Sequence, residues 1–216
     1  MTRALVTCTE AKTAALQELL APSRYSRGLA TGSGTDSTIL IADAESRRYL
    51  TNAGKHSKLG ELIGKAVKSA VKKALFLQTG LGPEQQHDAV ARFSRFGVSE
   101  AGLYRQYVLQ SGEHHLSRPK FANALEEVTK SGDGVAIASL LAHLMDQLDW
   151  GLLNRQEATD AAQLLLNSFA AKQALEFTWV KKEDPDAAEE ILNNWSALII
   201  SQAVQKAGDQ AAIRDT

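Results

Sequence analysis

The stretch Ser37-Thr38-Ile39-Leu40-Ile41-Ala42 decides the fold class, because it is the strongest strand signal in the sequence. It is β-branched and apolar, has the length of a strand, and is bounded by Asp36 and Asp43. A glycine-rich loop, residues 28–36, precedes it. We therefore predict a strand at residues 37–42 that lies inside a sheet.

The segment upstream of this strand has a helical pattern. Apolar residues between Ala4 and Leu20 fit one helical face, and we predict a helix that begins by Thr9 at the latest. Thr7 and Glu10 stand at capping-box spacing, so a short strand that runs into a helix at this point is the alternative.

The clearest helix follows the strand. Apolar residues recur every three or four positions from Leu59 to Leu75, and Ser57 is placed to cap the helix N-terminus. We expect this helix to end near Gln78, because two glycines and a proline follow within residues 79–83. Beyond them the sequence predicts helices at about residues 84–93, 99–111, 118–130, 135–153, 155–177 and 186–208, the last starting with Asp184 as cap and Pro185.

These elements predict an α+β fold that is predominantly helical. Residues 1–82 are expected to form a small strand-containing N-terminal unit, and residues 83–216 a helical domain of unknown role. The boundary coincides with a change of charge. Residues 1–82 hold 12 Lys and Arg against 6 Asp and Glu, whereas the remainder holds 12 against 19.

The overall composition is that of an ordinary globular protein, with 216 residues, 44% hydrophobic, 23% charged and a net charge of -1. This balance does not indicate a nucleic-acid partner. The single Cys8 can form neither an internal disulfide nor a multi-cysteine zinc site, and the apolar runs are too short to span a membrane. Residues 1–10 turn polar too soon for a signal peptide, so we expect a cytoplasmic protein.

The loop Thr31-Gly32-Ser33-Gly34-Thr35-Asp36 is the first candidate site. Its alternating glycines let backbone N–H groups converge on an anion or oxyanion, and its other side chains supply hydroxyls and one carboxylate. It matches neither the phosphate-binding P-loop, which ends in Gly-Lys-Ser or Gly-Lys-Thr, nor the dinucleotide fingerprint, which follows a strand. The alternative is a tight loop before a strand.

The segment Gly54-Lys55-His56-Ser57-Lys58-Leu59-Gly60-Glu61 is the second candidate site. A histidine and two lysines crowd the start of a strong helix, which makes sense if something negative or electron-rich docks there. His56 could act as a general acid or base near neutral pH. A solvated basic loop is the alternative. The pair His143 and Asp146 lacks a third ligand, so we predict no metal site.

Three segments, in this order and spacing, carry a family resemblance: Thr9-Glu10-Ala11-Lys12-Thr13-Ala14-Ala15-Leu16, residues 30–36 and residues 54–64. Together they resemble the adenosylcobinamide amidohydrolases. That family hydrolyses the amide joining the aminopropanol arm to the corrin ring of adenosylcobinamide, and it releases adenosylcobyric acid during cobalamin salvage. The resemblance implies a corrinoid substrate. It covers about residues 1–82, the C-terminal part of the family domain, whereas residues 84–216 match nothing in the family.

The catalytic roles are argued from the chemistry of amide hydrolysis, which needs an attacking oxygen, a base, a proton donor for the amine and donors for the oxyanion. Asp36 or Glu10 is the candidate base and His56 the candidate acid. Thr35 or Ser33 is a candidate nucleophile, with direct attack by water as the alternative. The amides of Gly32 and Gly34 are candidates for the oxyanion hole. We expect substrate contacts from Gly32, Ser33, Gly34, Lys12, Lys55, Ser57 and Lys58.

Two functions therefore remain open. One is the amidohydrolase reaction, without a cofactor, and the other is a non-catalytic corrinoid-binding or helical protein-interaction module left from a truncated amidohydrolase. Because the resemblance covers part of the family domain, the strand predicted at residues 38–42 would be an unpaired edge. We expect poor solubility of the chain alone, a homo-oligomer, or a partner chain that completes the sheet.

Overall fold

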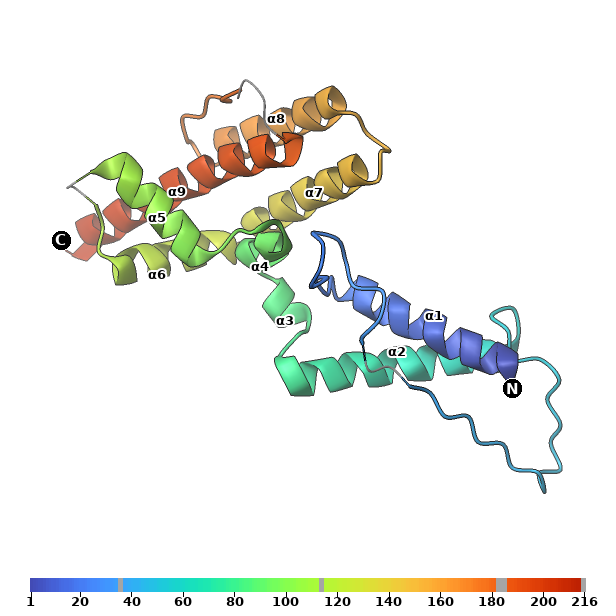
Figure 1. Ribbon diagram of the computed structural model, residues 1–216. Helices are drawn as coiled ribbons and strands as arrows, with labels where there is room; N and C mark the ends of the chain where they lie inside the picture. The colour runs from blue at the N-terminus through green and yellow to red at the C-terminus, as the bar shows by residue number, and fades with distance from the viewer. Residues whose placement is uncertain (35–36, 113–114, 182–185, 215–216) are drawn as a thin grey trace. The chain divides into compact units, whose positions relative to one another are not determined.

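The computed structural model describes residues 1–34, 37–112, 115–181 and 186–214, and their regular structure is entirely helical (Figure 1). These residues form nine α-helices and one short 3-10 helix, with no sheet. The elements are α1 Thr2–Glu18, α2 Lys58–Thr79, α3 Pro83–Gln86, α4 Ala89–Phe93, η1 Ser94–Phe96, α5 Glu100–Ser111, α6 Arg118–Thr129, α7 Gly132–Asp149, α8 Arg155–Lys172 and α9 Ala187–Arg214.

The prediction of an α+β fold is wrong, and the fold is all-α. Residues 37–42 lie in coil, with the side chains of Ile39 and Ile41 84% and 93% exposed. A strand is stable only when a neighbour accepts and donates its backbone hydrogen bonds, and no described segment does so for this stretch. One isolated bridge, between Pro22 and Leu29, is the only β pairing in the described residues. The expectation of a partner chain that completes a sheet rested on an edge strand at residues 38–42, and the described residues contain no such strand.

The N-terminal helix α1 begins at Thr2, so the alternative of a short strand before Thr9 is wrong. Its β-branched residues fit the helix because their hydroxyls bond back to the preceding turn. The Oγ1 of Thr7 lies 3.0 Å from the carbonyl oxygen of Arg3, and that of Thr9 donates to the carbonyl of Leu5 over 3.1 Å. Such bonds satisfy a threonine hydroxyl within a helix.

The prediction for α2 is confirmed at both ends. The hydroxyl of Ser57 accepts the N–H of Gly60 and caps the first turn. The helix ends at Thr79, one residue beyond the expected end, because Gly80 takes a left-handed conformation with φ of 74°.

The downstream helices are also confirmed, with local differences. The helix predicted at residues 84–93 is divided into α3 and α4, because the carboxylate of Asp88 caps a new helix through the N–H groups of Val90 and Ala91. The helix predicted at residues 155–177 ends at Lys172, since Ala174 adopts a positive φ of 53° and the chain becomes extended. The cap predicted at Asp184 and Pro185 lies outside the described residues.

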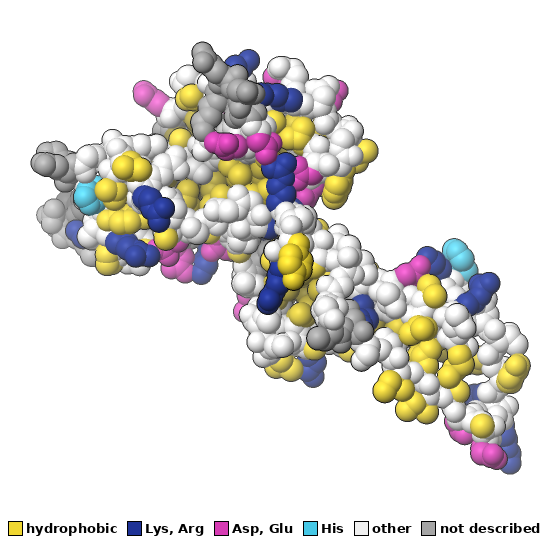
Figure 2. Space-filling view, viewed as in Figure 1, with side chains coloured by type: hydrophobic (Ala, Val, Ile, Leu, Met, Phe, Trp, Pro, Cys, Tyr) yellow, Lys and Arg dark blue, Asp and Glu magenta, His cyan; other side chains and the backbone are white. Residues whose placement is uncertain are grey.

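The chain divides into two compact units, residues 1–86 and 87–216. In the first, α1 packs on α2, and the small or apolar residues Cys8, Ala11, Ala15 and Leu16 of α1 are buried, as is Leu19 just after it. This unit is thin and leaves large apolar side chains in solvent, and Figure 2 shows hydrophobic side chains gathered over it. Among the exposed ones are Leu62, Phe76 and Leu77, at 54%, 52% and 73%.

The second unit has a continuous core of its own. Trp195 of α9 is fully buried and packs edge-on against Phe93 of α4, with ring centroids 4.5 Å apart. Arg95 and Asp146 form a buried two-pronged ion pair that ties η1 to α7, with N–O distances of 2.6 and 2.7 Å. Asp146 is thus engaged by Arg95, and it is not part of a metal site with His143 within the described residues.

Candidate functional site

A pocket of about 300 Å³ lies in the first unit, where α1 meets the segment that precedes α2. Four of its lining residues come from α1 and four from residues 52–56: Arg3, Val6, Thr7, Glu10, Asn52, Gly54, Lys55 and His56. The pocket therefore unites Glu10 from the first family-like segment with Lys55 and His56 from the third. These three residues were predicted site residues, and Glu10 lies 45 positions before Lys55 and 46 before His56.

The turn that carries Lys55 and His56 is held by its own hydrogen bonds. The side-chain oxygen of Asn52 accepts the N–H of Gly54 over 2.9 Å, and the carbonyl of Gly54 accepts the N–H of Ser57 over 2.9 Å. The hydroxyl of Ser57 also lies 2.8 Å from that carbonyl and 3.0 Å from the carbonyl of Asn52. This network orders the turn before α2 begins, and it assigns the Ser57 hydroxyl to capping. Its predicted role as a substrate contact stays a prediction.

A close approach of two glycines completes the turn. A Cβ atom on Gly60 would lie 2.0 Å from the carbonyl oxygen of Gly54 and 3.0 Å from that of Ala53. No side chain can occupy that space without moving the backbone, so glycine is required at position 60. The first turn of α2 therefore sits directly against the backbone of the turn that presents Lys55 and His56.

The buried side chain of Thr7 fastens this turn to α1. Its Oγ1 lies 3.0 Å from the carbonyl oxygen of Ala53, in addition to its bond within the helix. Sequence reasoning missed Thr7, Asn52 and Arg3 as site residues. Thr7 was considered for a helix cap, and nothing local in the sequence indicates that its hydroxyl contacts a backbone 46 residues away.

The glycine-rich loop is hydrogen-bonded to the same helix, α1. The Oγ1 of Thr13 donates to the carbonyl of Thr31 over 2.7 Å, and the side-chain amide of Gln17 donates to the carbonyl of Ala30 over 3.0 Å. Thr13 lies one turn along α1 from Glu10. Residues 3, 7, 10, 13 and 17 recur at helical spacing, so one face of α1 supports both the turn at 52–57 and the start of the glycine-rich loop.

The other predicted site residues that the structure describes, apart from Lys55, do not line the pocket. Gly32, Ser33 and Gly34 are exposed, and they do not line the pocket. Lys58 pairs with Glu61 in the first turn of α2, with 2.7 Å between Nζ and Oε2, and Lys12 lies outside the pocket lining. Thr35 and Asp36 lie outside the described residues, so their roles stay predictions.

The charged side chains that line the pocket are two cations, Arg3 and Lys55, and one anion, Glu10. Lys55 Nζ pairs with Glu10 Oε1 at 2.9 Å, and the two side chains are 64% and 47% exposed, so solvent screens this pair. Arg3 adds a guanidinium with no ion-pair partner in the described part of the chain, and it lies against Gly54. Because Arg3 and His56 stand beside an already neutralised Glu10, the pocket favours an anionic or electron-rich group.

A further set of charges joins α1 to α2, the helix that follows the pocket-lining turn. Glu18 at the end of α1 accepts bonds from Lys68 and Lys72 of α2, each at 2.5 Å. The hydrogen bonds from Lys68 and then Lys72 lower the pKa of Glu18 from 4.5 to about 2. Two of the lysines along α2 are thus engaged in holding α1 rather than being available to a ligand.

The described residues contain no group of three His, Cys, Asp or Glu side chains arranged to hold a metal ion. None of their helices is long and apolar enough to cross a membrane.

Comparison with known proteins gives one family and one relative. Residues 1–83 match the adenosylcobinamide amidohydrolase family. An uncharacterized protein of Methanocaldococcus jannaschii is 44% identical over 79 residues, which make up 36% of this chain and 30% of that protein. The matched segment thus spans less than a third of the curated relative. No solved structure matches the chain.

Proposed function

We propose, on the premise that residues 1–83 carry an adenosylcobinamide amidohydrolase family domain, that the chain hydrolyses the aminopropanol amide of adenosylcobinamide. The products are adenosylcobyric acid and aminopropanol. The observation that carries this proposal is the pocket, because it unites Glu10 with Lys55 and His56 from two separate family-like segments.

The reaction adds water across the amide. The water oxygen attacks the carbonyl carbon and loses a proton to a base, the C–N bond breaks, and the departing nitrogen takes up a proton. In this scheme Glu10 is the base and His56 the proton donor, since both side chains line the pocket. Asp36 remains a second candidate base, on a loop that begins beside Thr13, one helical turn from Glu10.

The cations of the pocket suit the charge that this reaction creates. Negative charge develops on the carbonyl oxygen during attack and remains on the carboxylate product. In this scheme Arg3 and Lys55, which line the pocket, stabilise it. The backbone amides of Gly32 and Gly34 are the alternative donors. Arg3 thereby joins the residues that the sequence pattern indicated.

A non-catalytic corrinoid-binding module is the second candidate function, and a specific observation favours it. Lys55 and Glu10 are 64% and 47% exposed, whereas catalytic charges act most strongly where water is excluded. The matched segment also covers 30% of its relative, so most of that longer protein has no counterpart in the match.

The two functions are separated by one assay. The purified chain is incubated with adenosylcobinamide, and adenosylcobyric acid is followed by chromatography and mass. We expect product with the natural chain and a loss of about a hundredfold or more in Glu10→Gln and His56→Gln. Glu45→Gln, at an exposed loop position of the same unit, is the matched control. Retained corrinoid binding without any product would refute hydrolysis and support the binding module.

A further inference from the structure

Helix α2 carries a second row of side chains that the first unit leaves uncovered. Its half-buried apolar residues Ile63, Val67 and Val71 recur at four-residue spacing, and α2 packs on α1. About half a turn around the helix runs a row of exposed residues, which we call the outer face: Leu62, Ala66, Ser69, Lys73 and Phe76. More than half of the Leu62 and Phe76 side chains is exposed.

The outer face has the spacing of a helix that packs along another helix. Its residues follow one another at intervals of four, three, four and three positions, the repeat along which paired helices pack. A helix at the surface of a domain carries polar residues on the side away from its packing partner, whereas α2 carries Leu62 and Phe76 there. The pattern of α2 is therefore that of a helix inside a larger domain.

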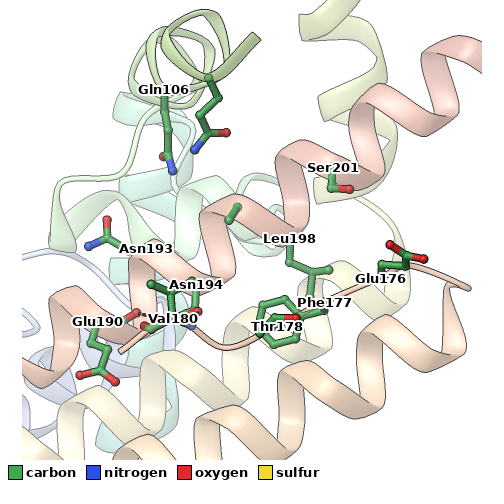
Figure 3. Close-up of a pocket in the computed structure, with 12 residues that line it drawn as sticks. Gln106, Glu176, Phe177, Thr178, Val180, Glu190, Asn193, Asn194, Leu198 and Ser201 are labelled. Carbon is green, nitrogen blue, oxygen red and sulfur yellow. Dashed lines mark hydrogen bonds between the residues drawn. The ribbon is translucent and has the colours of Figure 1, made fainter. Parts of the chain in front are cut away.

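The helical unit of the same chain shows how such a helix is covered. In α9, Ile191 and Ile200 lie on opposite sides of the helix, and both are buried. Helices α6 and α8 pack on α9, and the segment 176–180 lies beside it, with Val180 bonded to the side chain of Asn194 (Figure 3). By contrast, the 22 residues of α2 include one buried residue, Gly60. No described element of the first unit covers the outer face.

The family comparison indicates what covers it. Helices α1 and α2 lie within residues 1–83, which match the adenosylcobinamide amidohydrolase family. The M. jannaschii relative matches over 79 residues, which are 30% of its length, so most of that protein lies outside the match. Because a domain packs its helices around a shared core, the part of the family domain outside the match is the natural source of an element that covers α2.

We propose that the outer face of α2 binds a helix of a separate polypeptide that carries the remaining part of an adenosylcobinamide amidohydrolase domain. The partner helix presents apolar side chains to Leu62 and Phe76. It presents a carboxylate to Lys73, because a lysine enclosed in an interface needs a partner for its charge. The inference rests on the family match that also underlies the proposed function, and it does not depend on catalysis.

The test uses the full chain, co-expressed with the part of the M. jannaschii protein that lies outside the matched 79 residues. We expect the two polypeptides to co-purify as one complex in size-exclusion chromatography. Leu62→Glu and Phe76→Glu should each weaken the complex at least about tenfold, because a large apolar side chain is lost from the interface. Leu140→Glu, on α7 and exposed to a similar degree as Leu62, should leave it unchanged.

The charge of Lys73 gives a second measurement. Lys73→Glu places a carboxylate opposite the expected carboxylate of the partner, so we expect the complex to weaken at least about tenfold. Lys120→Glu, at an exposed position of α6, makes the same change of charge away from the outer face and should have no effect.

Thiol labelling measures whether the outer face is open in the chain alone. In Leu62→Cys the new thiol should react rapidly with a maleimide in the chain alone and slowly in the complex. The natural Cys8 is buried and provides the background rate.

Four results would overturn the proposal. The first is no complex with the natural chain, including a partner polypeptide that stays insoluble beside it. The second is a complex that Leu62→Glu and Phe76→Glu leave intact. The third is self-association of the chain alone that these substitutions abolish, because a second copy then occupies the face. The fourth is slow labelling of Leu62→Cys in a monomeric chain. No corrinoid is present in these measurements, so they are decided separately from hydrolysis.

Discussion

The hydroxyl of Thr7 lies 3.0 Å from the carbonyl oxygen of Ala53, a residue 46 positions further along the chain. This contact attaches the turn that carries Lys55 and His56 to the helix that carries Glu10. Both segments contribute to the pocket, so this partly buried contact helps to set the geometry of the candidate site.

Replacing Thr7 by valine tests this contact. Valine keeps the shape but leaves the carbonyl of Ala53 without its donor, so we expect a loss of about 1–2 kcal/mol in the free energy of unfolding. Thr9→Val is the matched control, because the hydroxyl of Thr9 bonds within α1 alone. Urea unfolding followed by circular dichroism measures both. Equal effects of the two substitutions would show that the contact with Ala53 contributes nothing.

The packing of α2 on the preceding turn predicts opposite effects of alanine at two glycines. Gly60→Ala should destabilise the first unit and displace the turn, since the new Cβ would meet the carbonyl of Gly54 at 2.0 Å. Gly64→Ala has open space around it in the same helix, and it should stabilise the helix by about 0.5–1 kcal/mol. Thermal unfolding of the two variants compares them, and a neutral Gly60→Ala would contradict the close approach.

The charges between α1 and α2 predict a pH-dependent contribution from Glu18. Its pKa is lowered from 4.5 to about 2 in the folded chain, so its contribution is fully present above about pH 4.5 and is lost as the pH falls toward 2. The stability difference between the natural chain and Glu18→Gln should therefore shrink over that interval. The effect is small because the carboxylate is solvated, and Glu45→Gln should show no comparable change. A difference that stays constant from pH 6 to pH 2 would argue against the two lysine contacts.

The ion pair between Arg95 and Asp146 predicts a large effect in the helical unit. The two side chains are 5% and 11% exposed, so Asp146→Asn removes the carboxylate that the buried Arg95 guanidinium pairs with and should cost about 3–5 kcal/mol. Asp133→Asn removes the exposed pair with Lys172 and should cost less than about 1 kcal/mol. Tryptophan fluorescence during denaturation reports on this unit, since all three tryptophans lie in it. A cost below 1 kcal/mol for Asp146→Asn would mean that the buried pair is not formed.

Arg3 is predicted to bind or stabilise negative charge in the pocket. Arg3→Met should lower kcat/KM for adenosylcobinamide about ten- to a hundredfold, because a charge-assisted hydrogen bond is lost. Arg24→Met, at an exposed position in the coil after α1, is the control. In a chain that only binds, the same loss should appear in the corrinoid affinity. If Arg3→Met left both kcat/KM and the corrinoid affinity unchanged, Arg3 would not be part of the site.

Local signals in the sequence determined most of the helices. Ser57 caps α2, Gly80 ends it, and apolar residues at helical spacing mark the face between them. These signals act within one or two turns, and they can be read without knowledge of the rest of the chain. Glu10, Lys55 and His56 could also be named as site residues from the sequence, because their segments carried the family resemblance.

The state of residues 37–42 could be decided only by tertiary structure. A β-branched run such as Thr38 to Ala42 has the preference of a strand, but a strand also needs a neighbour for its backbone hydrogen bonds. The described residues supply none, so the run remains exposed coil. The roles of Thr7, Asn52 and Gly60 likewise depend on which backbone lies beside them. Helices form from local bonds and were determined by the sequence itself, whereas strand pairing and the assembly of the pocket depend on contacts between distant residues.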